Sequence, residues 1–201
     1  MDGGVRGGAS GLERLIEIGL ALSAERNHDR LTERILLEAI DITHADGGTL
    51  YLRTEENTLK FAIVRTGSLK IAMGGTTGVP IPFPPVRMYI ADTGAPNYNN
   101  VSAAAALKKQ TINIEDAYTA EGFDFSGTKK FDQGTGYRSK SFLCIPLKNY
   151  TDDIIGVLQL INAQDETGTV IPFSKEIQRM VEALASQAAV RSEEHTSELQ
   201  S

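Results

Sequence analysis

The polar side chains best placed to bind a small molecule lie close together in the sequence: Asp132, Thr135 and Ser139, interleaved with Gly134 and Gly136. Glycines at this spacing permit a tight connection with positive φ angles. We expect this connection to bring the carboxylate and the two hydroxyls to the mouth of a sheet, where they would form the polar rim of a ligand site. The alternative is that they only cap the turn, since Asx and Ser/Thr turns use the same side chains.

No set of residues in the sequence is typical of an active site. The chain has three histidines and one cysteine, so neither a nucleophile–base pair nor the several converging ligands of a metal centre can be recognised. The pair His28-Asp29 matches the two-residue core of metal phosphohydrolases, but we interpret it as a helix boundary with Asp29 as the N-cap. We therefore expect no catalytic residues, no metal and no cofactor.

Composition and charge restrict the class of protein. The net charge is −6 and no basic stripe is present, which argues against nucleic acid as the main partner. No apolar run approaches the length that crosses a membrane, and the N-terminus lacks the regions of a signal peptide. The single cysteine, Cys144, excludes an internal disulfide and fits a reducing compartment. We predict one cytoplasmic domain with a sizeable core.

Two β-rich runs form the centre of the predicted fold. Residues 137–147 and 154–162 flank a short polar linker, which predicts an antiparallel hairpin. The second run is almost continuously apolar, as is typical of a strand that is buried on both faces. Gly156 interrupts this run and has no side chain to pack, so we expect a bulge or a close approach of another backbone there.

The segments around this hairpin predict helices and a second hairpin. Ser10 is expected to begin the first helix, with Glu13 completing a capping box, and Asp46-Gly47-Gly48 is expected to end the second helix. The remaining expected elements are a hairpin of residues 49–53 and 58–64, an irregular passage at 66–100, an alanine-rich helix at 101–109, a short strand at 111–114, a helical turn from 115 and a last helix opening at 173–174.

This order of elements predicts an α+β fold. The central antiparallel sheet would carry the N- and C-terminal helices on one face, and short helices plus a long loop over the other. Apolar stripes on the terminal helices would allow two copies to pair as a homodimer. We expect residues 1–9 to be a flexible N-terminus and residues 10–190 to form the domain. Residues 191–201 (RSEEHTSELQS) resemble the translation of a sequencing-library adapter, so we do not count them as native sequence.

Four runs, in this order, resemble a GAF domain: residues 113–118 (NIEDAY), 132–139 (DQGTGYRS), 143–149 (LCIPLKN) and 155–162 (IGVLQLIN). The resemblance covers residues 12–190 and is closest to cyclic-nucleotide-binding GAF domains of phosphodiesterases and adenylyl cyclases, and to GAF modules that precede bacterial HD-GYP phosphodiesterase domains. It implies a regulatory, non-catalytic sensor of a small molecule, with a cyclic nucleotide as the leading ligand. Such a sensor would control an output domain that is missing from the C-terminus of this bacterial signalling protein. The alternative is a dimerisation module without a ligand.

In cyclic-nucleotide-binding members the ligand lies over the sheet, beneath the short helices. The positions of this chain that match their pocket are Val101, Ser102, Asp132, Thr135, Ser139 and Gln159. The resemblance implies that backbone N–H groups at the start of the Val101 helix would bind the cyclic phosphate. Asp132 and the hydroxyls would contact the purine edge. Gln159 is both donor and acceptor, so it would contact either the base or a neighbouring chain.

The sequence also departs from these members. They carry an Asn-Lys … Phe-x-x-x-Asp-Glu motif whose Lys and Asp form an ion pair. Here Asn162 and Phe173 keep the pattern, but Ala163 replaces the Lys and Ile177-Gln178 replaces Asp-Glu. Both partners are missing together, so no buried charge is left unpaired. Bilin attachment and methionine-sulfoxide reduction, two other chemistries of this family, are disfavoured because the single cysteine is followed by isoleucine and has no second thiol.

Overall fold

The computed structural model describes the backbone of residues 7–200 and the side chains of residues 11–189. Within this part the chain forms five helices and an eight-stranded antiparallel sheet. The helices are α1 (Gly7–Ala24), α2 (His28–Thr43), α3 (Val101–Lys108), α4 (Ser126–Thr135) and α5 (Lys175–Gln200). The strands are β1 (Ala45–Arg53), β2 (Thr58–Thr66), β3 (Ile71–Gly74), β4 (Val86–Arg87), β5 (Ile112–Ile114), β6 (Phe142–Lys148), β7 (Ile154–Gln164) and β8 (Val170–Ile171).

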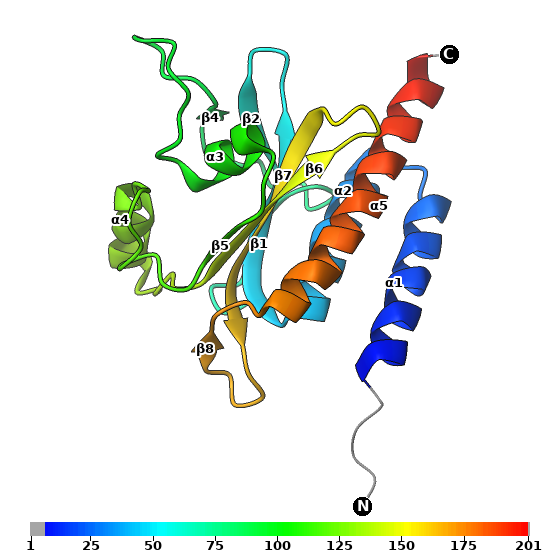
Figure 1. Ribbon diagram of the computed structural model, residues 1–201, viewed down its shortest axis with the longest axis horizontal. Helices are drawn as coiled ribbons and strands as arrows, with labels where there is room; N and C mark the ends of the chain where they lie inside the picture. The colour runs from blue at the N-terminus through cyan, green and yellow to red at the C-terminus, as the bar shows by residue number, and fades with distance from the viewer. Residues whose placement is uncertain (1–6, 201) are drawn as a thin grey trace, which may run out of the picture.

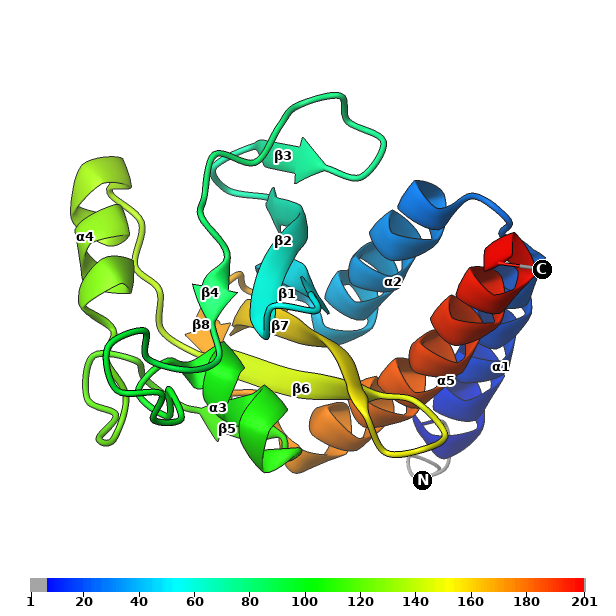
Figure 2. The same cartoon turned by 90° about the horizontal axis from the view of Figure 1, so that it is seen from above.

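The helices form layers on the two sides of the sheet. The strand order is β3-β2-β1-β7-β6-β5, with β4 paired to β2 and β8 paired to β7. Helices α1, α2 and α5 cover one face (Figures 1 and 2). Helices α3 and α4 lie on the other side, together with the long connection between β3 and α3. The predicted α+β arrangement, with the first and last helices on the same face, is confirmed.

Each layer has its own hydrophobic core. On the side of the long helices, aliphatic side chains at i, i+4 and i+8 of α2 (Leu31, Ile35 and Ala39) pack with buried residues of α5 and of the sheet. On the other side, α3 packs against the sheet through residues 103–106, which are all alanine and essentially without exposed surface. Because these side chains are small, the α3 backbone lies close to the strands below it.

Gly156 lies where β7 meets β1. A Cβ at this position would be 2.2 Å from the carbonyl oxygen of Tyr51, far inside any permitted contact. The β6–β7 register also shifts here, between Leu147 and Lys148. Both the bulge and the close backbone approach that the sequence predicted at Gly156 are therefore present, as is the central hairpin.

The starts of the first two helices differ from the prediction. Helix α1 already includes Gly7, so Ser10 lies inside the helix and does not cap it. Residues 1–6 of the N-terminal stretch lie outside the described residues. Helix α2 is capped by Asn27, whose side chain accepts a hydrogen bond from Arg30 N at 2.9 Å, and not by Asp29, which is in the first turn.

The end of α2 also differs, because Asp46-Gly47-Gly48 belongs to β1 and not to a turn. The helix ends instead at His44, which adopts a left-handed conformation with φ of 53°. The glycines serve strand packing: a Cβ on Gly47 would lie 2.3 Å from the carbonyl oxygen of Arg65 on β2. A glycine pair after a helix was thus wrongly interpreted as its stop signal.

The stretch that contains Asp132 and Ser139 is mostly helix, whereas the sequence predicted a turn followed by a strand. Residues 126–135 form α4, and β6 begins only at Phe142. Only Gly136 uses a positive φ, of 73°, and its N–H donates to the carbonyl oxygen of Asp132 at 2.8 Å as the helix ends. Gly134 lies inside the helix.

Two further segments differ from the prediction. The passage at 66–100 contains the short strands β3 and β4, and the helical turn expected from residue 115 is a non-helical turn. Within residues 7–200, none of the helices combines the length and the apolarity needed to cross a bilayer. The backbone of α5 continues through residues 191–200; that this stretch comes from an adapter stays a prediction.

Candidate functional site

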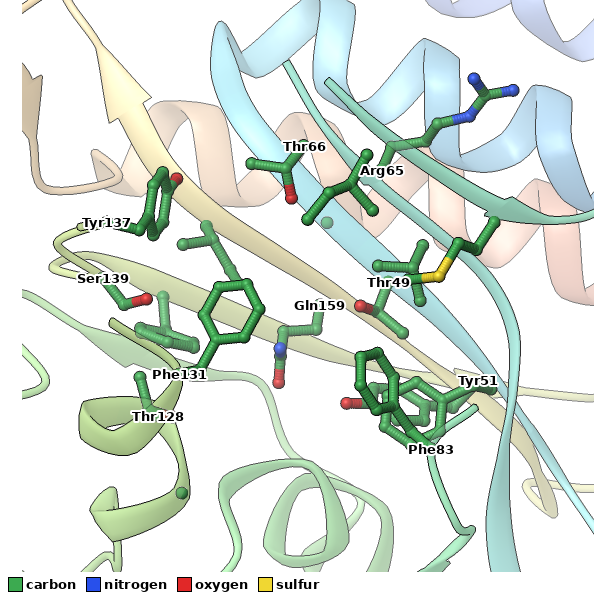
Figure 3. A pocket seen from close by; sticks show the side chains of 18 residues that line it. Thr49, Tyr51, Arg65, Thr66, Phe83, Thr128, Phe131, Tyr137, Ser139 and Gln159 are labelled. Carbon is green, nitrogen blue, oxygen red and sulfur yellow. The ribbon is translucent and has the colours of Figure 1, made fainter. Parts of the chain in front are cut away.

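A pocket of about 250 Å³ opens on the face of the sheet that carries α3 and α4 (Figure 3). Strands β1, β2, β6 and β7 form its floor, and β3, α4 and the connection after β3 form its walls. It is lined by Gly48, Thr49, Tyr51, Phe61, Val64, Arg65, Thr66, Ile71, Met73, Phe83, Gly127, Thr128, Phe131, Tyr137, Ser139, Phe142, Gln159 and Ile161. Such an apolar lining with a few polar groups is typical of small-molecule sites.

Two phenylalanines from distant segments form opposite walls of the pocket. Phe131 projects from α4 and Phe83 from the connection after β3, and they lie on either side of Gln159 (Figure 3). Their exposed fractions, 38% and 40%, are high for phenylalanine. The Phe83 ring also lies 5.4 Å from that of Phe61, centroid to centroid. These rings offer flat apolar surfaces to a planar ligand.

Gln159 is the polar centre of the pocket floor. It lies on β7, directly across from Thr49 on β1 and Cys144 on β6. Ser102 Oγ donates to Gln159 Oε1 at 2.8 Å, and the Cys144 thiol lies 3.5 Å from the same oxygen. The amide is therefore held with its oxygen toward α3. Among the described residues, no acceptor forms a hydrogen bond with Gln159 Nε2, so this group is available to a ligand.

Cys144 does not add reactivity to this site. Complete burial raises the pKa of its thiol to about 12, although a hydrogen bond with Ser102 partly opposes the shift. The group stays a neutral thiol at physiological pH and acts as a small packing residue.

Asp132 is a buried positioning residue. Its Oδ1 accepts a hydrogen bond from Ser139 Oγ, and its Oδ2 accepts hydrogen bonds from Ser139 N and Tyr118 OH, each at 2.8 Å. Within α4, all of whose side chains the structure describes, it is the only buried one, with 3% exposed. The carboxylate thus attaches α4 to the segment before β6 and fixes the Ser139 hydroxyl at the pocket wall.

Tyr137 closes one corner of the pocket through a chain of hydrogen bonds. Its hydroxyl donates to Asp46 Oδ2 at 2.7 Å and accepts from Asn162 Nδ2 at 3.0 Å. Asp46 also accepts from Ser68 N at 3.0 Å and from Ser68 Oγ at 2.6 Å. Burial raises the pKa of the Tyr137 phenol, and the nearby Asp46 carboxylate raises it further, so the hydroxyl stays protonated and keeps donating.

Four of the predicted site residues meet at this pocket. Ser139 and Gln159 line it directly, while Ser102 and Asp132 lie behind them and hold them through the hydrogen bonds above. Two of the four thus act through a neighbour. The sequence could not separate these two roles, because all four have polar side chains of similar type.

The other two predicted residues lie away from the pocket lining. Val101 is buried in the core between α3 and the sheet. Thr135 is on the exposed side of α4, where its Oγ1 donates to the carbonyl oxygen of Phe131 at 2.8 Å. The sequence analysis missed Phe83 and Phe131 as pocket walls. The available signal was a large aromatic side chain in an otherwise polar segment, now helix α4, and another in a proline-rich connection.

The model of the GAF domain matches residues 27–191 of this chain. The chain belongs to the GAF domain family. This match confirms the resemblance inferred from the four sequence runs. GAF domains are regulatory sensor domains, so the chain has a regulatory role.

Solved structures of other proteins share the fold. The GAF domain of a phosphoenolpyruvate-protein phosphotransferase from Coxiella burnetii superposes with a TM-score of 0.69, at 13% identity, over 98% of this chain and 100% of that one. The free methionine-R-sulfoxide reductase of Neisseria meningitidis gives a TM-score of 0.67 at 14% identity, over 98% of this chain and 97% of that one. At these identities the comparison shows the fold alone.

Curated relatives are similar in sequence over part of their length. The cGMP-specific 3′,5′-cyclic phosphodiesterase of Drosophila melanogaster is 30% identical over 150 residues, which is 75% of this chain and 12% of that protein. The corresponding protein of Drosophila ananassae is 32% identical over 158 residues, with the same two shares. This GAF domain therefore spans about 12% of the length of these relatives.

Proposed function

We propose that this GAF domain senses a cyclic nucleotide whose purine ring lies in the pocket. The observation that carries the proposal is the pocket between Phe83 and Phe131, with the unpaired Gln159 Nε2 at its floor. Aromatic faces suit a purine, and an amide donor suits an acceptor on the edge of its ring. The names of the phosphodiesterase relatives support the same ligand class.

The wider role in this proposal is regulation of an output domain on the C-terminal side of α5. Ligand binding would favour one packing of α1, α2 and α5 and so bias the activity of that domain. The GAF domain itself would have no catalytic activity. A cytoplasmic location and a bacterial signalling protein as the parent chain are part of the same proposal.

Calorimetry with cyclic GMP, cyclic AMP and cyclic di-GMP tests the proposed ligand class. At least one of them is expected to release or absorb heat and to raise the melting temperature. Phe131→Ala should weaken that binding about tenfold, because it removes one aromatic wall. Tyr150→Ala is the matched control, since Tyr150 is 82% exposed on the β6–β7 turn. Absence of heat and of any thermal shift with all three compounds would contradict the proposal.

A second candidate function, dimerisation, is favoured by an apolar row on α1. Leu12, Ile16 and Leu20 recur at i, i+4 and i+8 and are 61%, 52% and 69% exposed. Such a row would suit the same row of a second copy.

Sedimentation velocity tests the dimer directly. Ile16→Glu is expected to weaken self-association about tenfold or more, because it introduces a charge into the apolar row. Ile16→Leu should leave it unchanged. A wild-type chain that sediments as a monomer at every concentration would rule out this candidate.

A further inference from the structure

We propose that the pocket selects its ligand by an uncharged planar ring system and makes no specific contact with an anionic group. The inference rests on the proposed function and narrows it to the ligand class that is recognised: a purine base or nucleoside. A cyclic phosphate would lie at the mouth of the pocket, in contact with solvent, and would contribute little to affinity.

The first observation is that, among the described side chains, no free cation lines the pocket. Arg65 is the only cationic residue of that lining. Its guanidinium group forms an ion pair with Glu33 of α2 and points away from the pocket (Figure 3). Arg138 is close by in sequence, but it is bound to the Asp116 carboxylate at 2.8 and 3.0 Å. Arg65 is thus directed toward α2, and Arg138 is not among the residues that line the pocket.

The second observation concerns the start of α3, the other group suited to bind a phosphate. The side chain of Asn100 caps this helix: its Oδ1 accepts hydrogen bonds from Ser102 N and Ala103 N, both at 3.0 Å. These N–H groups are therefore already satisfied. Neither Val101 nor Ser102 lines the pocket.

The third observation is the presence of two carboxylates directly behind the pocket wall. Asp132 holds Ser139, and Asp46 holds Tyr137. Both are hydrogen-bonded to hydroxyl and peptide N–H groups, and within residues 11–189 neither has a cation within ion-pair distance. Their negative charges are not neutralised locally, so they disfavour an anion in the pocket.

The fourth observation is that the free polar groups suit the edge of a neutral heterocycle. Gln159 Nε2 is a donor without an acceptor in the described part of the chain. The one proton of the Ser139 hydroxyl is donated to Asp132, so this oxygen can only accept from a ligand. A donor and an acceptor beside the flat faces of Phe83 and Phe131 match a purine ring, whose edge carries both kinds of group.

Calorimetry on matched pairs tests this inference: guanosine against cyclic GMP, and adenosine against cyclic AMP. In the pair that binds, we expect the two dissociation constants to agree within about threefold. Neither affinity should fall as NaCl rises from about 50 to 500 mM, since no ion pair is formed with the ligand. A cyclic nucleotide that binds more than about tenfold tighter than its nucleoside, with affinity that falls as salt rises, overturns this inference but leaves the proposed function intact. Absence of binding in both pairs overturns this inference, and absence of binding with cyclic di-GMP as well overturns the proposed function.

A charge-neutralising variant gives an independent measurement. Asp46→Asn keeps an oxygen that can accept from Tyr137 but removes one negative charge behind the wall. The affinity for the cyclic nucleotide, relative to that for its nucleoside, should rise about two- to threefold. Glu56→Gln removes the same charge on the exposed β1–β2 turn and should leave the ratio unchanged. An unchanged ratio in Asp46→Asn contradicts the inference.

Discussion

Replacing Gly156 with alanine is expected to lower the free energy of unfolding by about 3 kcal/mol or more, which is a large part of the stability of an ordinary domain. The new Cβ would be 2.2 Å from the Tyr51 carbonyl oxygen and 3.3 Å from its carbonyl carbon. These atoms belong to the backbone of β1, which pairs with β2 on one side and β7 on the other. The neighbour cannot move aside without breaking the centre of the sheet.

The matched control is Gly134→Ala. Gly134 lies inside α4, its φ is not positive, and a Cβ added to it would meet no atom of a neighbouring segment within 4 Å. Alanine there should raise stability by about 0.5–1 kcal/mol, because it restricts the unfolded chain and favours the helix. Urea unfolding followed by circular dichroism compares the two variants. Equal midpoints for Gly156→Ala and the wild type would show that β1 and β7 are less closely packed than the structure has them.

The second large effect is expected at Asp132. Asp132→Ala should lower the free energy of unfolding by about 3 kcal/mol, since it leaves the Ser139 N–H, the Ser139 hydroxyl and the Tyr118 hydroxyl without their acceptor. The same change should release α4, whose buried contact with the rest of the protein is this carboxylate. Hydrogen exchange of the α4 amides, measured beside the urea midpoint, should therefore become faster.

Two variants separate the role of Asp132 from a general effect of mutating α4. Asp132→Asn keeps one acceptor oxygen but turns an amide N–H₂ toward the donors, so it should be intermediate in stability. Thr135→Ala, on the exposed side of the same helix, should change stability by about 0.5 kcal/mol or less. If Asp132→Ala were as mild as Thr135→Ala, the carboxylate would not be what holds α4.

The parts of the fold that the sequence predicted well are those with a strong local signal. The central hairpin follows from two β-rich runs around a polar linker. The glycine at position 156 correctly indicated the close approach of the β1 backbone. The alanine-rich helix was placed within one residue, at Val101–Lys108. In these segments local propensity and tertiary packing favour the same structure.

The errors have a common physical cause. Helix α4 contains Gly127 and Gly134, which favour a turn on local grounds, and it is held by hydrogen bonds from Asp132 to residues outside the helix. Gly47 and Gly48 similarly suggested a helix stop, but they are needed because another strand backbone passes close to each. A glycine can mark either a close approach of another backbone or a positive φ angle, and the sequence alone does not distinguish the two.

Only the polar residues of the candidate site could be predicted, because its aromatic walls depend on contacts between segments that are distant in the sequence. Polar residues on the hairpin and α3 could be placed near one another from the order of the elements. The walls could not, because Phe83 and Phe131 come from segments about fifty residues apart and meet only through tertiary structure. Gln159 could be named, but its orientation depends on Ser102, which comes from a different layer.

The position of Glu33 joins the pocket to the opposite layer of the protein. Besides its ion pair with Arg65, this α2 side chain accepts hydrogen bonds from the backbone and hydroxyl of Thr76, at the start of the segment that carries Phe83. Burial alone would raise the pKa of Glu33, but the bonds from Thr76 and the charge of Arg65 together lower it, so the carboxylate stays charged. A ligand that displaced Phe83 outward would therefore also displace Thr76 and, through Glu33, helix α2. The conformational change would first reach a helix on the opposite side of the sheet.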